Sequence, residues 1–136
     1  MAGVSEEDVH WEGHGLLVDL GRYGGPDVKP AFVSYLKPNT LGRCQSACHA
    51  LREVRGEWAV ELLGPLLTDR RETDATYAVD PEKKERSWLR ERICDMAAET
   101  IGLHNPELKF ELRGTHRELD QQIEKIRKQI MAGKKP

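Results

Sequence analysis

The sequence is poor in aromatic residues and cysteines, and it contains no long apolar run. Only 6% of its 136 residues are aromatic, and three are cysteines. Three thiols cannot all pair within one chain, so we expect no disulfide framework. Reduced thiols, as found in the cytoplasm, are expected instead. The apolar stretches are too short to cross a bilayer, and the start of the chain lacks the basic and apolar regions of a signal peptide. We therefore predict a cytoplasmic protein with no membrane partner.

The motifs of several enzyme classes are also missing. The glycine-rich residues 21–26 have neither the lysine nor the preceding strand of a phosphate-binding loop. No serine stands in the strand-turn-helix motif of a hydrolase nucleophile. We therefore expect no catalytic residues and no cofactor, and we interpret the chain as a protein that is not an enzyme.

Two groups of residues have the spacing of metal ligands, but both have a simpler explanation. Cys44 and Cys48 are four residues apart and would share one helical face, as zinc-binding thiolates can. Like Cys94, they occupy apolar positions of a predicted helix, where cysteine acts as a small buried hydrophobic residue. His10 and His14 have the same spacing, but a tryptophan follows the first histidine where a metalloprotease needs glutamate. We therefore predict no metal site.

Charge is abundant and unevenly distributed. Charged residues make up 32% of the chain and apolar residues 38%, with a formal net charge of -2 and a pI of about 6.2. Residues 1–30 carry six acidic and two basic residues, a net -4, whereas residues 113–136 carry seven basic and three acidic residues, a net +4. The lean core suits a thin layer of helices. The overall acidity disfavours a nucleic-acid partner.

Helix start and stop signals predict a chain of helices. They indicate three helical pairs, over residues 6–36, 40–68 and 87–131. The glycine and proline at residues 64–65 are expected to bend the fourth helix. Residues 69–86 lack helical periodicity and are predicted to form a polar loop. Ser87 is expected to cap the fifth helix, and Thr115 and Glu118 have the spacing of a capping box before the last one.

The apolar pattern repeats along the chain. An offset of 31 residues places Leu20 on Leu51 and also aligns the apolar positions of the helices that follow. An offset of 50 places Leu51 on Ile101, and the difference, 50 - 31 = 19 residues, is about the length of the polar loop. Helical units that repeat in this way are typical of solenoids, whose units bury their apolar faces by stacking.

Three short segments carry a family resemblance. Residues 28–33, Val-Lys-Pro-Ala-Phe-Val, and residues 59–63, Ala-Val-Glu-Leu-Leu, each follow a glycine turn. They look like the second helix of HEAT-like repeats of the phycobilisome-lyase type. Residues 92–95, Arg-Ile-Cys-Asp, resemble the helix start that follows an elaborated loop in the last repeat of bacterial HEAT-repeat proteins. The resemblance, which covers about residues 8–104, implies an all-α fold. We expect a single domain over residues 1–136, a short α-solenoid or superhelix of antiparallel helix pairs with a C-terminal capping helix.

The polar loop is the best candidate for a functional site. Loops of this length in a compact domain are usually functional or disordered, and arginine and aromatic side chains are common interface anchors. The predicted partner-binding residues are Arg70, Arg71, Tyr77, Lys83, Lys84, Arg86 and Trp88. The alternative is a solvated linker with Trp88 in the core. Trp58, at the start of the fourth helix, is a further candidate, although packing over the turn is favoured for it.

Repeats without a chemical motif indicate a function in binding. We predict a non-catalytic protein–protein interaction or scaffold module. The sequence leaves open which protein is its partner and what its oligomeric state is. The resemblance implies one alternative, a subunit or helper of a bilin-lyase-like enzyme. The basic residues of the loop and of the C-terminal helix suggest another, nucleic-acid binding.

Overall fold

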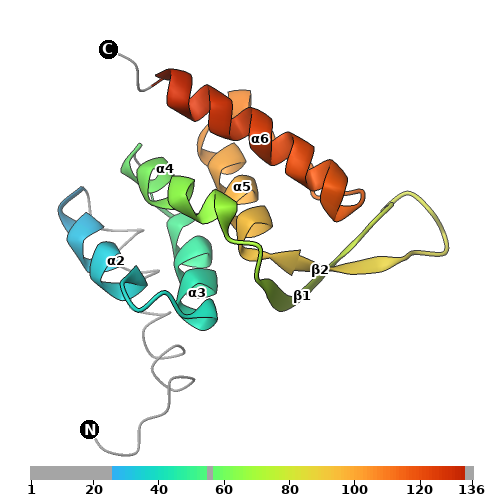
Figure 1. Cartoon of the computed structure of the whole chain (residues 1–136), viewed down its shortest axis with the longest axis horizontal. Coiled ribbons are helices and arrows are strands. Elements are labelled where there is room, and N and C mark those ends of the chain that lie inside the picture. Colours follow the sequence, from blue (N-terminus) through green and yellow to red (C-terminus); the bar gives the residue numbers. More distant parts are fainter. Residues whose placement is uncertain (1–25, 55–56, 134–136) are drawn as a thin grey trace, which may run out of the picture.

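A computed structural model describes residues 26–54 and 57–133 of the chain. Within these residues there are five α-helices, three 3-10 helices (η) and a two-stranded antiparallel sheet. In chain order the elements are η1 (Pro26–Val28), α2 (Lys29–Leu36), α3 (Leu41–Leu51), α4 (Trp58–Leu63), η2 (Gly64–Thr68), β1 (Glu72–Ala78), β2 (Trp88–Arg92), α5 (Ile93–His104), η3 (Pro106–Leu108) and α6 (His116–Gly133). Figure 1 shows the helices as one body from which the two strands project as a hairpin. The predicted first helix, with His10 and His14, lies outside the described residues.

The prediction of an all-α solenoid is wrong, because the protein is a small mixed α/β domain. Residues 69–86, predicted as a polar loop, contain strand β1, which pairs antiparallel with β2. The register places Tyr77 opposite Leu89 and Ala78 opposite Trp88. Along most of β1, exposed side chains alternate with buried or half-buried ones. This period of two marks a strand, and a search for helical periodicity misses it.

The fifth helix begins at Ile93 and not at Ser87, so the predicted cap is wrong as well. Residues Trp88–Arg92 form β2, and the chain turns directly into α5 after Arg92. The Arg92 backbone N–H donates a hydrogen bond to the Asp95 carboxylate at 2.9 Å. A carboxylate in the first turn therefore satisfies a free backbone donor at the helix start, the role that Ser87 was expected to play.

Two other expected helix signals agree with the structure. The Glu118 backbone N–H donates to Thr115 Oγ1 at 3.2 Å, and the Thr115 N–H donates to the Glu118 carboxylate at 3.4 Å, which confirms the capping box. The fourth helix changes at the expected place, since α4 ends at Leu63 and the chain continues as η2 from Gly64. The buried face of α6 consists of Leu119, Ile123 and Ile126.

Helix α5 is the centre of the core. Its buried residues are Ile93, Cys94, Asp95, Met96, Ala97, Ala98, Thr100 and Ile101. It packs against α3, α4, η2, η3 and α6, and Figure 1 shows it beneath α6 and beside α3 and α4. Alanines are buried on both sides of the α3–α5 contact, at Ala47 and Ala50 on α3 and at Ala97 and Ala98 on α5. Their small side chains let the two helix backbones approach closely.

One buried arginine joins three elements. Arg92 is only 4% exposed, and its Nε and Nη2 donate to the two oxygens of the fully buried Asp95 at 3.0 and 2.9 Å. Nη2 also donates to Asp120 Oδ1 at 2.8 Å and to the backbone oxygen of His116 at 3.4 Å. Burial alone would lower the pKa of Arg92, but the hydrogen bonds to Asp95 and Asp120 outweigh it and raise the pKa. One guanidinium therefore connects the end of β2 with the first turn of α5 and the first turns of α6.

We expect the substitution Arg92→Met to destabilise the fold by about 3–5 kcal/mol, because it leaves the buried Asp95 carboxylate without its cation. Methionine retains much of the apolar volume of the side chain, so the loss of stability measures mainly the removal of the positive charge. The free energy of unfolding from urea denaturation measures the effect. Arg90→Met, an exposed change on the same strand, serves as the control and should stay within about 0.5 kcal/mol of the wild type. Equal stabilities for the two variants would show that the network is dispensable.

Candidate interaction site on the hairpin

The hairpin has an inner and an outer face. On the inner face Tyr77 is 4% exposed, and its hydroxyl donates a hydrogen bond to the backbone oxygen of Gly114 at 2.9 Å. On the outer face Trp88 is 56% exposed and Arg90 is also exposed, whereas Leu89 between them is half-buried. Side chains alternate between the faces of a strand. The hairpin therefore packs one face on the helices, and its other face is exposed at Thr76, Trp88 and Arg90.

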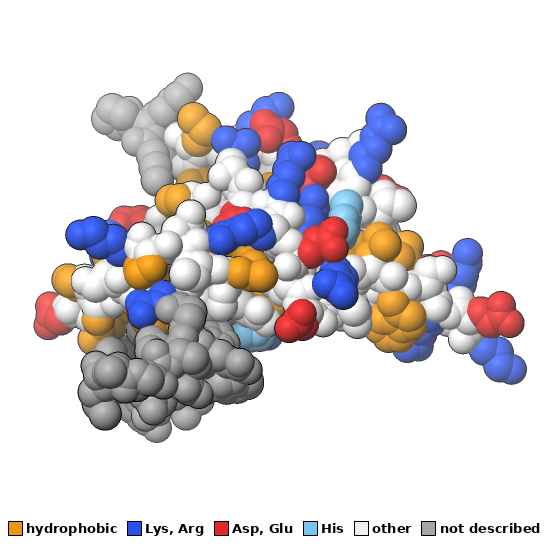
Figure 2. Space-filling model, turned by 60° about the horizontal axis from the view of Figure 1, so that its bottom comes forward, with side chains coloured by type: hydrophobic (Ala, Val, Ile, Leu, Met, Phe, Trp, Pro, Cys, Tyr) orange, Lys and Arg blue, Asp and Glu red, His pale blue; other side chains and the backbone are white. Residues whose placement is uncertain are grey.

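The exposed part of the hairpin combines an aromatic side chain with several cations. We define the hairpin surface as three outer-face residues and three tip residues: Thr76, Trp88 and Arg90, with Lys83, Lys84 and Arg86. All six are exposed. In Figure 2 the tip of the hairpin, at the right, shows charged side chains, and apolar side chains lie between the tip and the body. Of these residue types, tryptophan and arginine are enriched in protein interfaces, whereas lysine is not.

Four of the predicted partner-binding residues come together on this surface. Lys83, Lys84 and Arg86 are exposed at the tip, and Trp88 begins the strand that leaves it. The alternative in which Trp88 belongs to the core is wrong, because more than half of its side chain is exposed. The tip is thus exposed and available to a partner.

Arg70 and Arg71 lie at the base of the hairpin. Arg71 donates from Nη1 to the backbone oxygen of Asn39 at 2.9 Å and from Nη2 to the Asp69 carboxylate at 2.7 Å. The hydrogen bond from Arg71 lowers the pKa of Asp69. Arg70 is directed toward α6, where its Nη2 lies 3.9 Å from Asp120 Oδ2. These contacts give Arg71 a structural role between the hairpin and α3 and place Arg70 away from Trp88.

Tyr77 and Trp58 are packing residues in this structure. Burial raises the pKa of Tyr77 to about 12, so its phenol remains a hydrogen-bond donor to Gly114 at neutral pH. Trp58 is 7% exposed and packs edge-on against Phe32, with the ring centroids 5.6 Å apart. Edge-to-face aromatic pairs of this kind stabilise cores. The structure thus places Trp58 in the packing role favoured for it.

Sequence reasoning missed Arg90. This residue is exposed on β2, two positions after Trp88 and opposite Thr76. Residues two apart on a strand share a face, so Arg90 lies beside Trp88 on the outer face. The sequence of residues 88–92, Trp-Leu-Arg-Glu-Arg, does not alternate between apolar and polar side chains, so no sequence signal placed Arg90 beside Trp88.

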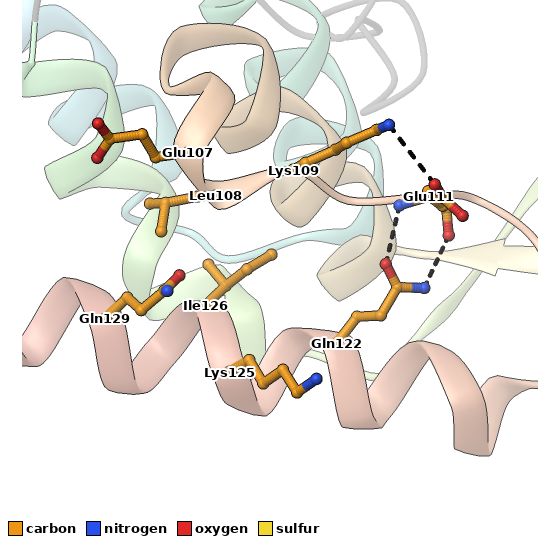
Figure 3. A pocket seen from close by; sticks show the side chains of 8 residues that line it. All are labelled: Glu107, Leu108, Lys109, Glu111, Gln122, Lys125, Ile126 and Gln129. Carbon is orange, nitrogen blue, oxygen red and sulfur yellow. Dashed lines mark hydrogen bonds and ion pairs between the residues drawn. The ribbon is translucent and has the colours of Figure 1, made fainter.

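A shallow groove lies between α6 and the segment that follows η3. It has a volume of about 330 Å³, with Leu108 and Ile126 among its lining residues. Figure 3 shows the pairings of Lys109 and Gln122 with Glu111 at one end of it. The Gln122 side chain bonds the backbone N–H and C=O of Glu111, both at 2.9 Å, and Lys109 forms an ion pair with Glu111. These pairings hold the segment against α6, so we interpret the groove as part of the packing.

The cysteines are buried thiols. Burial raises the pKa of Cys44 and of Cys48, and it raises that of Cys94 to about 12. Protonated thiols are poor nucleophiles and poor metal ligands. In residues 26–54 and 57–133, no group of three or more His, Cys, Asp and Glu side chains could hold a metal ion. None of the helices in this part of the chain is both long and apolar enough to cross a membrane.

A buried carboxylate lies on the inner face of the hairpin. Glu91 is 8% exposed, and its pKa is raised to about 7, first by burial and then by repulsion from Glu99 and Asp95. Arg52, which forms an ion pair with Glu99, offsets part of this effect. Glu91 therefore carries its charge unfavourably at this buried position, where β2 contacts α5.

Searches against protein-family models, curated proteins and solved structures found no match for this chain. The resemblance to HEAT-like repeats thus depends only on the short segments in which it was noted. The hairpin surface is defined by its own geometry.

We expect Tyr77→Phe to reduce the free energy of unfolding by about 1 kcal/mol, because the backbone oxygen of Gly114 loses its donor inside the protein. Urea denaturation of the variant and the wild type measures the difference. Trp88→Phe is the matched control, since it changes an exposed aromatic residue on the opposite face and should alter stability little. A larger loss for the Trp88 variant would contradict the assignment of inner and outer faces.

Protonation of Glu91 should stabilise the fold. Its pKa is about 7 in the native state against an ordinary value of 4.5, so the stabilisation is present below pH 4.5 and is lost as the pH rises through 7. At about 1.4 kcal/mol per pKa unit, the loss is at most roughly 3.5 kcal/mol. Glu91→Gln should therefore raise the free energy of unfolding more at pH 8 than at pH 5, whereas Glu85→Gln at the exposed tip should not. A difference that is the same at both pH values would contradict the native-state pKa.

Proposed function

We propose that this protein is a non-catalytic protein–protein interaction module that binds its partner through the hairpin surface. The observation that carries the proposal is the exposure of Trp88, 56%, on the free face of a short sheet. Large aromatic side chains contribute strongly to binding when a partner covers them, and tryptophan and arginine are the residues most enriched among such anchors.

The structural setting of Trp88 supports this function. The strand that carries Trp88 ends in Arg92, which is bound to Asp95 and Asp120 in the core. On the opposite strand, the Tyr77 hydroxyl is anchored at Gly114. A side chain on a strand held at these points loses little conformational freedom on binding, which favours affinity. The rigid helical body then acts as the support of a projecting recognition element.

The chemistry of the other candidate sites gives catalysis less support. The three thiols are buried with raised pKa values. The groove beside α6 is lined by polar groups that pair with one another, such as Gln122 with the backbone of Glu111. Neither place combines an activated nucleophile with a base that can reach it.

The proposal predicts that position 88 contacts the partner directly. The photoreactive residue benzoylphenylalanine, placed at Trp88, should cross-link a protein in a nuclease-treated extract of the natural host, and mass spectrometry identifies it. The control is the same residue at Leu103, which is 60% exposed near the other end of α5. Trp88→Ala should abolish capture of the identified protein while changing the free energy of unfolding by less than about 0.5 kcal/mol. Cross-linking that is absent, or that is equal at positions 88 and 103, would refute the proposal.

A further inference from the structure

The cations of the hairpin surface lack acidic partners. Lys83, Lys84, Arg86 and Arg90 form no ion pair with any residue in the described part of the chain. Two acidic residues nearby do have a basic partner. Arg113 approaches the carboxylates of Asp80 and Glu82 at 3.4 and 3.5 Å. The segment 82–90 therefore presents four cations without an acidic partner, together with the exposed Glu82 and Glu85, a net charge of +2 (4 - 2) on a chain whose net charge is -2.

Acidic side chains lie both at the tip and on β1, and Glu82 and Glu85 are exposed among the cations of the tip. Glu72 and Asp74 are exposed on β1, whereas Arg86, Trp88 and Arg90 lie on or just before β2. The net positive charge is thus confined to the tip and β2, because the exposed charged residues of β1 are acidic. A short acidic segment fits such an area, while a long polyanion that continued across the sheet would meet Glu72 and Asp74.

From this charge pattern we infer that the partner presents a short acidic peptide segment with an apolar or aromatic anchor. The inference rests on the proposed function and adds the chemical class of the partner. The anchor would cover Trp88, and its flanking carboxylates would accept hydrogen bonds from the guanidinium groups of Arg86 and Arg90, which suit planar carboxylates. Lys83 and Lys84 would add long-range attraction that raises the association rate.

A random dodecapeptide library displayed on phage tests this class directly. The full-length wild-type protein selects from the library, and enriched peptides are synthesised with a fluorescent label and measured by anisotropy. We expect peptides rich in Asp and Glu with at least one apolar residue, and affinity that falls between about 50 and 300 mM NaCl. The double variant Arg86→Glu/Arg90→Glu should weaken binding at least about tenfold. The matched control, Arg117→Glu/Lys128→Glu, changes the net charge equally on exposed residues of α6 and should stay within about twofold.

The outcomes separate this inference from the proposed function. Enrichment of neutral or basic peptides, or binding that needs Trp88 but tolerates Arg86→Glu/Arg90→Glu, would overturn the acidic class and leave the protein-binding function in place. If a labelled random single-stranded oligonucleotide or vesicles with anionic lipid bind more tightly than every peptide, and lose binding in that double variant, the acidic-peptide inference is wrong. If no selected peptide depends on Trp88, the proposed function itself fails.

Discussion

The buried guanidinium of Arg92 is the interaction on which the rest of this structure depends. Asp95 is fully buried and Arg92 nearly so, and either charge alone would carry a large desolvation cost. The pair is tolerated because the planar guanidinium meets both Asp95 oxygens and still reaches Asp120 and the backbone of His116. Since a buried ion pair adds little net stability, we interpret this network as selecting one arrangement of β2, α5 and α6 over others.

The central helix extends this constraint to the rest of the domain. At its far end, Gly102 lets the chain return across α5, because a Cβ at this position would lie only 3.3 Å from Phe110 N and 3.4 Å from Leu108 O. The returning segment then meets α6, where the Gln122 amide pairs with the backbone of Glu111. Helix α6 is thus bound near its start through Asp120 and again two residues later through Gln122. The core and the support of the hairpin are one continuous set of contacts.

The elements that sequence reasoning predicted are those with local signals. The capping box of Thr115 and Glu118 and the apolar stripe of α6 lie within one helix and could be recognised there. The hairpin has no such local signal at helical spacing. The 19 residues by which the second offset exceeds the first therefore predict a loop between repeats. Arg92 depends on Asp120, 28 residues away, and no pattern in the sequence joins them. At the site, composition was enough to nominate Lys83, Lys84, Arg86 and Trp88, but Arg90 required knowledge of the strand.

The register of the hairpin links the core to the candidate binding surface. A two-stranded sheet is marginal alone, and a slip of one residue would turn Leu89 and Glu91 outward and Trp88 inward. Arg92 opposes such a slip, because it is paired with Glu72 across the strands and bound to Asp95 and Asp120 in the core. Arg92 has the same parity along β2 as Trp88 and Arg90, yet it is buried while they are exposed. One face of the strand is therefore core at its base, where Arg92 is bound, and surface toward its tip, where Trp88 is exposed.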